Sequence, residues 1–189
     1  MYNSYISKSY QVQNLQKKQS MTAFANALIE LMKTKNLEKI QVSELCCKAD
    51  YSRRTYYRLF QSKEDILYFY IDNLCMEYYH LFFGTTDTSL SGVSNIFFKY
   101  WYQQKDFLAL LHANQLDSLL LERFSKLLPQ VYLSKEKTSI TTKDDKSRYY
   151  MAIFCAGGFC NLLLSWMQNN FEDSPEYMST IVHHIMEME

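Results

Sequence analysis

Residues that break helices are scarce in this chain, which has 4 glycines and 2 prolines among its 189 residues. Sheets need frequent turns, and turns draw heavily on these two residues. Long stretches without either one therefore favour helices over strands. Apolar residues make up 48% of the chain, which is enough to bury a sizeable core. The sequence predicts an all-α fold of about nine helices.

Charge is distributed unevenly, although the formal net charge is zero. Residues 1–63 contain 11 basic and 4 acidic residues, a net charge of +7. Residues 64–189 contain 9 basic and 16 acidic residues, a net charge of −7. A basic head followed by an acidic body is typical of a protein that binds a polyanion with its head and does something else with its body.

Several other classes of protein are disfavoured. The five cysteines follow no secretory signal, so we expect reduced thiols in a cytoplasmic protein. Cys46 and Cys47 diverge on a helix and no histidine has ligand spacing, so neither a metal nor another cofactor is expected. No catalytic motif is present, and the apolar residues 151–167 are too few to span a membrane. We expect neither an enzyme nor a membrane protein.

The first helices of the head follow from apolar periodicity. Residues 1–19 are polar, and we expect a flexible arm there. Helical spacing of apolar residues begins at Met21 and ends near Met32. A helix of about two turns follows, with Ser43 as its N-cap.

A tight turn and a third helix complete the head. Asp50 tolerates the left-handed conformation that such a turn often needs. Ser52 caps the third helix, which we expect to run from Arg53 to about Phe60. Helix, tight turn and short helix within a basic segment predict a helix-turn-helix domain over residues 20–65.

The third helix has two contrasting faces. Its apolar face carries Tyr56, Leu59 and Phe60 and should pack on the other helices. The opposite face gathers cationic and phenolic side chains, namely Arg53, Arg54, Tyr57 and Arg58. Arginine can bond guanine through two hydrogen bonds, and tyrosine can contact phosphate or a thymine methyl. This face predicts binding to double-stranded DNA, and the alternative is a solvated surface helix.

The same stretch resembles the N-terminal domain of the TetR family of bacterial regulators over about residues 20–70. The resemblance is carried by Ala49, Asp50, Tyr51, Ser52, Arg53, Arg54, Thr55, Tyr56, Tyr57, Arg58, Leu59 and Phe60, and then by Ser62, Lys63, Glu64, Asp65 and Leu67. It implies that Arg53, Arg54, Thr55, Tyr57 and Arg58 face the DNA, that Ser43 and Lys63 hold phosphates, and that Ser52 belongs to the same surface. Two positions depart from the family pattern, because Asp50 replaces the turn glycine and Leu59 replaces a polar residue.

The body is predicted over residues 66–189. Ser62 and Asp65 form a capping box that starts a helix ending near Phe83. Further helices are expected at about 91–103, 106–112, 115–133, 145–169 and 174–188, with a polar loop over 134–146. Pro175 marks the start of the last helix.

The resemblance implies a homodimer formed by the last two helices. Ala156, Gly157 and Gly158 remove side-chain bulk from an apolar helix, so another helix could approach closely there. The predicted interface residues are Tyr150, Gly157, Gly158, Asn161, Trp166 and Ile181. The alternative is a helix buried within its own chain.

The resemblance also implies a cavity for a small molecule in the body. Aromatic residues are dense there, and they serve both ligand pockets and ordinary cores. The predicted ligand-binding residues are Phe82, Phe97, Trp101, His112 and Phe154. The resulting hypothesis is a repressor that binds an inverted-repeat operator as a dimer and releases it when a small apolar or aromatic inducer binds. The alternative is an activator or interaction protein controlled by a protein partner.

Overall fold

The computed structural model describes residues 2–87, 89–134 and 144–187, and every regular element within these ranges is a helix. This confirms the predicted all-α class. The chain divides into two compact units, one ending at Tyr70 and the other beginning at Ile71. The helix α4, Lys63–Gly84, contributes its first eight residues to unit 1 and the remainder to unit 2.

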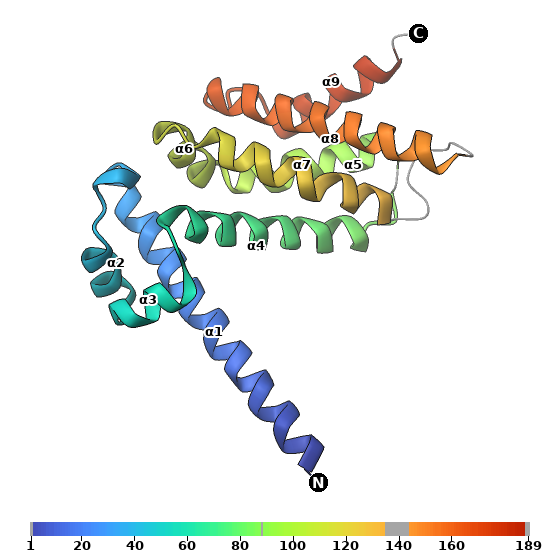
Figure 1. Ribbon diagram of the computed structural model, residues 1–189. Coiled ribbons are helices and arrows are strands. Elements are labelled where there is room, and N and C mark those ends of the chain that lie inside the picture. The colour runs from blue at the N-terminus through green and yellow to red at the C-terminus, as the bar shows by residue number, and fades with distance from the viewer. Residues whose placement is uncertain (1, 88, 135–143, 188–189) are drawn as a thin grey trace. The chain divides into compact units, whose positions relative to one another are not determined.

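Unit 1 contains the predicted order of helix, helix, tight turn and helix. Its elements are α1 (Tyr2–Met32), the short 3-10 helix η1 (Leu37–Lys39), α2 (Val42–Ala49) and α3 (Arg53–Leu59). Residues 2–19 form the first part of α1 (Figure 1), whereas the sequence predicted a flexible arm there. These residues contain no glycine or proline, so nothing in their sequence interrupts a helix.

The core of unit 1 is organised around Phe24 of α1, which is fully buried. Its ring lies 5.8 Å from that of Tyr56 and 5.9 Å from that of Phe60, both in edge-to-face geometry. The ring of Tyr51 lies 5.6 Å away. Burial raises the pKa of Tyr56 to about 12, so its phenol stays neutral at physiological pH. The contacts fix the apolar face of α3 against α1.

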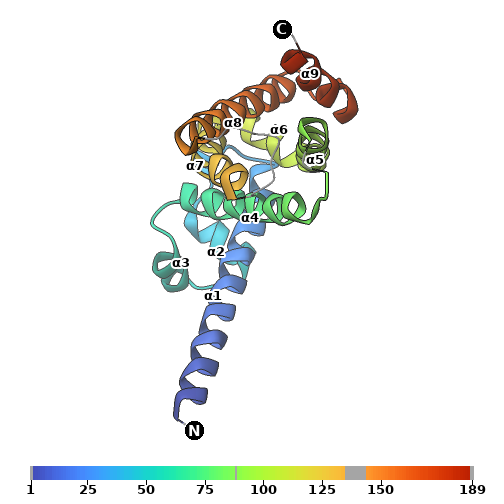
Figure 2. The same cartoon turned by 90° about the vertical axis from the view of Figure 1, so that its right-hand side faces the viewer.

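Unit 2 is a bundle of the remaining helices. These are α5 (Leu90–Gln103), α6 (Lys105–Ala113), α7 (Asp117–Ser134), α8 (Asp145–Gln168) and α9 (Pro175–Glu187), together with residues 71–84 of α4. The predicted helices lie within about two residues of these bounds, which is the usual scatter for helix ends. Figures 1 and 2 show α7 beside α8 and α5 beside α9. Residues 135–143 of the predicted loop lie outside the described residues.

Aromatic side chains fill the core of unit 2. The ring of Tyr78 on α4 meets that of Phe97 on α5 at 5.7 Å, and the ring of Trp101 lies 4.6 Å from that of Phe124 on α7. Phe97 reaches α8 through Phe159, at 4.9 Å between ring centroids. A buried hydrogen bond of 2.7 Å between the hydroxyls of Ser94 and Ser179 joins α5 to α9.

Candidate nucleic-acid interface

The helix α3 presents its cationic side to solvent. Its N-cap is Ser52, whose hydroxyl accepts a hydrogen bond of 3.1 Å from the backbone N–H of Thr55. Tyr56 and Phe60 are buried, as predicted for the apolar face. The exposed residues of the helix are Arg53, Arg54, Tyr57 and Arg58, and Tyr57 is 65% exposed. The structure thus gathers the predicted DNA-facing side chains on one surface, with Thr55 half-buried beside them.

The turn between α2 and α3 has the geometry predicted for Asp50. This residue ends α2 with φ 57° and ψ 42°, in the left-handed region. Its backbone N–H donates to the carbonyl of Cys47, and the N–H of Tyr51 donates to that of Cys46. A residue other than glycine can hold this conformation because aspartate tolerates it better than most side chains. The replacement of the turn glycine therefore leaves the helix-turn-helix geometry intact.

The start of α2 differs from the prediction, because Gln41 and not Ser43 is the N-cap. Glu44 accepts a hydrogen bond of 3.1 Å from the backbone N–H of Gln41, which is half of a capping box. Ser43 lies inside the first turn and is exposed. Its hydroxyl is therefore free of the capping role that the sequence assigned to it, and the predicted phosphate contact stays a prediction.

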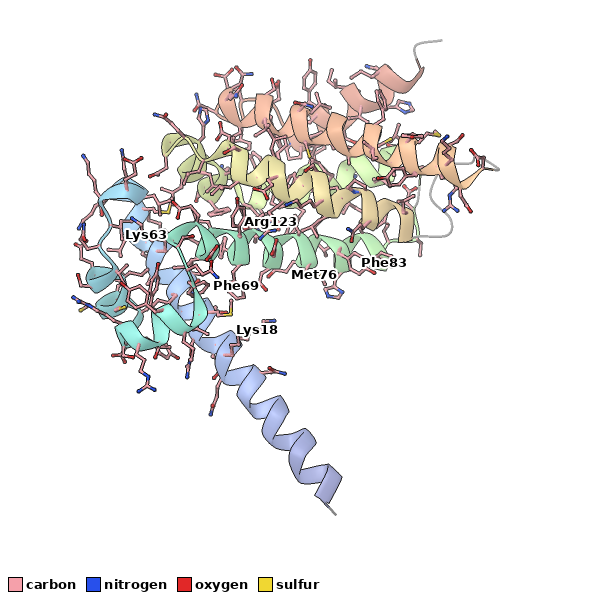
Figure 3. All side chains as sticks on the ribbon, in the orientation of Figure 1. Lys18, Lys63, Phe69, Met76, Phe83 and Arg123 are labelled. Atoms are coloured by element: carbon pink, nitrogen blue, oxygen red, sulfur yellow. The ribbon has the colours of Figure 1, made fainter. Side chains whose placement is uncertain are left out.

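Lys63 has a structural role that the sequence did not reveal. Its ammonium donates to the backbone carbonyls of Leu37, Glu38 and Ile40, the last at 3.0 Å (Figure 3). These three acceptors use all three protons of the ammonium. A phosphate contact from Lys63 would require one of the three bonds to break. The side chain instead ties the start of α4 to the end of the η1 segment within unit 1.

Replacing Lys63 by methionine should therefore destabilise the protein. We expect the free energy of unfolding to fall by about 1–3 kcal/mol, because three hydrogen bonds from a charged donor to exposed or part-buried carbonyls are lost. Urea denaturation followed by circular dichroism measures this. The matched control is Lys39→Met, which removes the same charge from an exposed residue of the same segment. If the two variants are equally stable and K63M alone shows a flatter salt dependence of DNA binding, Lys63 contacts a phosphate, as the sequence predicted, and does not stabilise unit 1.

The five predicted ligand-binding residues do not meet in one place. Phe82, Phe97 and Trp101 are fully buried in the aromatic core of unit 2. His112 is exposed, and its Nδ1 lies 2.8 Å from a carboxylate oxygen of Asp117. Phe154 is 72% exposed on the surface of α8. Three of the five therefore belong to the packed core, and the other two lie outside it.

Two polar features of unit 2 escaped the sequence analysis. The indole N–H of Trp101 is buried and finds no hydrogen-bond partner among the residues that the structure describes. Arg123 of α7 reaches toward α4, where its Nε lies 3.2 Å from a carboxylate oxygen of Asp72 (Figure 3). Burial raises the pKa of Asp72, and the Arg123 guanidinium opposes that shift. No spacing rule links positions so far apart in the chain, so no sequence signal could have paired them.

The helix α8 leaves a wide apolar surface uncovered within its own chain. Exposed residues on it include Tyr149, Tyr150, Met151, Ile153 and Phe154, with Gly157, Gly158 and Asn161 on the next turns. Its opposite side, with Ala152, Ala156, Cys160 and Leu163, is buried in unit 2. An apolar groove of about 160 Å³ runs along this surface and is lined in part by Phe154, Gly158, Val182 and Ile185. Exposed apolar surface of this extent marks an interaction site.

Trp166 does not belong to that surface, which corrects its prediction as an interface residue. It is 2% exposed, and its ring stacks on Tyr102 at 5.4 Å between centroids. Its indole N–H donates to the carbonyl of Asp173 at 3.1 Å. A second chain could reach Trp166 only if its contacts with Tyr102 and Asp173 were broken. Tyr150, Gly157, Gly158 and Asn161 are exposed and Ile181 is half-buried, so these five remain candidates for the interface.

Comparison with known proteins gives one family match. The family model TetR_C_8, described as "Transcriptional regulator C-terminal region", matches residues 87–188, which is more than half of the chain. No curated protein matches the chain significantly in sequence.

Three solved structures resemble the fold over most of its length. The first is "Dihydroxyacetone kinase operon activator DhaS", at 19% identity and a TM-score of 0.59 over 88% of this chain and 93% of that one. The second is the fatty acid degradation regulator FadR from Bacillus halodurans, at 15% identity and a TM-score of 0.57 over 88% and 94%. The third is a TetR transcriptional regulator from Streptococcus agalactiae 2603V, at 25% identity and a TM-score of 0.56 over 92% and 98%.

Proposed function

Since the chain belongs to the TetR family of transcriptional regulators, we propose that it binds an inverted-repeat DNA operator as a homodimer and represses transcription until a small molecule binds. The observation that carries the DNA-binding part is the exposed face of α3. Two adjacent arginines, a third one turn later and a tyrosine are held outward there by a firmly packed apolar side. Like charges crowded in this way repel in the free protein and are relieved by a polyanion.

The homodimer is supported by the exposed apolar side of α8. A two-fold dimer uses the same surface patch on both chains. Gly157 and Gly158 are exposed, and a Cβ added at either one would meet no atom within 4 Å. Their absence of side chains therefore serves no contact within the chain, which fits the close approach of a second α8. The alternative use of an apolar helix is insertion into a membrane. Residues 151–167 alone are short for a span, as the sequence predicted, but the 24 residues of α8 have the length and composition of one. Insertion would strip the buried side of α8 from the core of unit 2.

Selection of bound duplexes from a random-sequence DNA pool tests this function. We expect enrichment of an inverted repeat whose half-sites are centred about one helical turn, roughly 10 base pairs, apart or a multiple of it. The spacing follows because a two-fold dimer presents its two α3 helices symmetrically to successive major grooves. Enrichment of single half-sites would contradict binding as a dimer. No enrichment at all would contradict sequence-specific DNA binding.

Control by a small molecule is supported by the orphan indole N–H of Trp101. Buried donors are nearly always paired, so this one calls for an acceptor that the described part of the chain does not provide. The surrounding rings of Tyr78, Phe97 and Phe124 suit an apolar or aromatic inducer that carries such an acceptor. A regulator of this kind acts on chromosomal DNA, so we place it in the cytoplasm.

A second candidate is an activator controlled by a protein partner. Two observations favour it. The predicted ligand-binding residues are divided between a packed core and the surface, and one structural neighbour is described as an operon activator. Native mass spectrometry of the purified protein separates the two candidates. A bound small molecule whose removal strengthens operator binding supports the repressor, whereas persistent operator binding with a protein retained on unit 2 supports the activator.

A further inference from the structure

A second polar surface lies in the groove between α1 and α3. It adjoins the exposed cationic face of α3, which is called the recognition face below. The groove has a volume of about 740 Å³. One wall is formed by the middle of α1, through Gln16, Lys17, Gln19 and Ser20. The other wall is formed by Arg58 and Leu59 of α3, and Tyr51 of the preceding turn also lines it. All of these elements belong to unit 1.

The chemistry of this groove fits an anion of extended shape. Its described lining residues include two cations, Lys17 and Arg58, and no carboxylate. Both cations are exposed, and Leu59 is the one aliphatic residue of this described set. The glutamine amides add neutral hydrogen-bond donors, which commonly contact phosphate oxygens in DNA complexes. The described lining thus offers cations and amides to a phosphate, beside the rings and methyl groups of Tyr51 and Leu59, and no described carboxylate stands among them to repel it.

Helix geometry explains why this wall of α1 and no other faces α3. Gln16, Gln19 and Ser20 have the i, i+3 and i+4 spacing of one helix face, and Lys17 flanks it. Ser20 is buried and its hydroxyl donates to the carbonyl of Gln16. Lys18 points away from α3 (Figure 3). The two neighbouring lysines point about 100° apart on α1, and Lys17 lines the groove whereas Lys18 is not among its lining residues.

Arg58 joins this groove to the recognition face. It follows Arg54 by four residues, so the two side chains are neighbours on α3. The cationic surface accordingly continues from Arg54 over Arg58 into the groove and ends at Lys17. A DNA strand whose bases are read by α3 has its sugar-phosphate backbone directly alongside, and a groove next to the reading helix is placed to receive it.

We propose that the groove between α1 and α3 binds the phosphodiester backbone flanking each operator half-site, with Lys17 as a phosphate-contacting residue. This rests on the proposed function, because it assumes that α3 lies in the major groove. Leu59 stands where the family often has a polar residue. The contact from α1 supplies, on the same side of the head, the backbone interaction that an aliphatic Leu59 lacks.

The test uses the full-length protein and a duplex carrying the selected inverted repeat. Lys17→Gln is compared with Lys18→Gln, which removes the same charge from the adjacent residue, which does not line the groove. We expect K17Q to lower the slope of log affinity against log salt by about 0.9 for each chain bound, and K18Q to leave it unchanged. Hydroxyl-radical footprinting should show protection of flanking sugars that K17Q loses and K18Q keeps. Both residues are exposed, so both variants should fold, which circular dichroism verifies.

The possible outcomes distinguish the groove proposal from the proposed operator binding on which it rests. Equal slopes and footprints for K17Q and the unmodified protein overturn the groove proposal while leaving operator binding by α3 intact. Equal losses in K17Q and K18Q indicate a general charge effect and also overturn it. Failure of the unmodified protein to bind any duplex overturns the proposed function together with this extension of it.

Discussion

The double variant Arg53→Ala, Arg54→Ala should lose specific operator binding. Each arginine that reads a base contributes about 1–3 kcal/mol at one position, so the pair accounts for roughly 2–6 kcal/mol in each half-site. Both guanidiniums are exposed on α3 and can be removed without disturbing the core that Tyr56 and Phe60 form with Phe24. Fluorescence anisotropy with the selected duplex and with a scrambled duplex measures the change.

A matched control separates base reading from loss of charge. The variant Lys18→Ala, Lys33→Ala also removes two positive charges from exposed positions of unit 1, one on α1 and one in the turn that follows it, and neither residue belongs to α3. We expect this control to leave the affinities for the selected and the scrambled duplex close to those of the unmodified protein, and to preserve the ratio between them. The arginine variant should instead bring the two affinities together. If it weakens both duplexes equally, Arg53 and Arg54 contact only phosphates, and sequence must be read by other residues.

The features of this fold that could be predicted are local. Ser52, Ser62 and Pro175 mark helix starts because each acts within its own first turn. Asp50 marks the tight turn for the same reason, since its left-handed conformation depends on its own backbone. The exposed face of α3 follows from the alternation of apolar and cationic residues over two turns. None of these features requires knowledge of a distant part of the chain.

The features that could not be predicted depend on distant partners. Lys63 has acceptors 23 to 26 residues earlier in the chain, and its spacing from them follows no helical repeat. The placement of Trp166 also failed, for a different reason. The helix α8 is apolar on nearly all sides, so its periodicity does not distinguish the side that faces the core from the side left exposed. Aromatic residues such as Phe97 and Trp101 pose the same ambiguity, because a pocket wall and a packed core use the same side chains.

Replacing Phe154 by aspartate should convert the proposed dimer to a monomer. Phe154 is 72% exposed on the apolar surface of α8, and a two-fold interface formed by that surface would contain it twice. Burying each phenyl ring contributes about 1.5–3 kcal/mol, so losing both weakens association by roughly 3–6 kcal/mol, or about 10²–10⁴-fold. An unpaired carboxylate buried in the proposed interface adds a desolvation cost. Sedimentation velocity measures the shift from dimer to monomer. The control is Leu81→Asp, which places the same charge at a 52% exposed apolar residue of α4.

The F154D variant also tests whether operator binding depends on the proposed dimer. Phe154 lies in unit 2 and the recognition helix in unit 1, so the substitution leaves the DNA-reading residues unchanged. In a dimer, binding of the first half-site holds the second head at a high effective concentration near its own half-site. F154D should therefore lose most of its affinity for the inverted repeat while keeping the affinity of the unmodified protein for an isolated half-site. Undiminished binding of the inverted repeat by a monomeric F154D would mean that each head reads DNA independently, and that the exposed side of α8 serves a different partner.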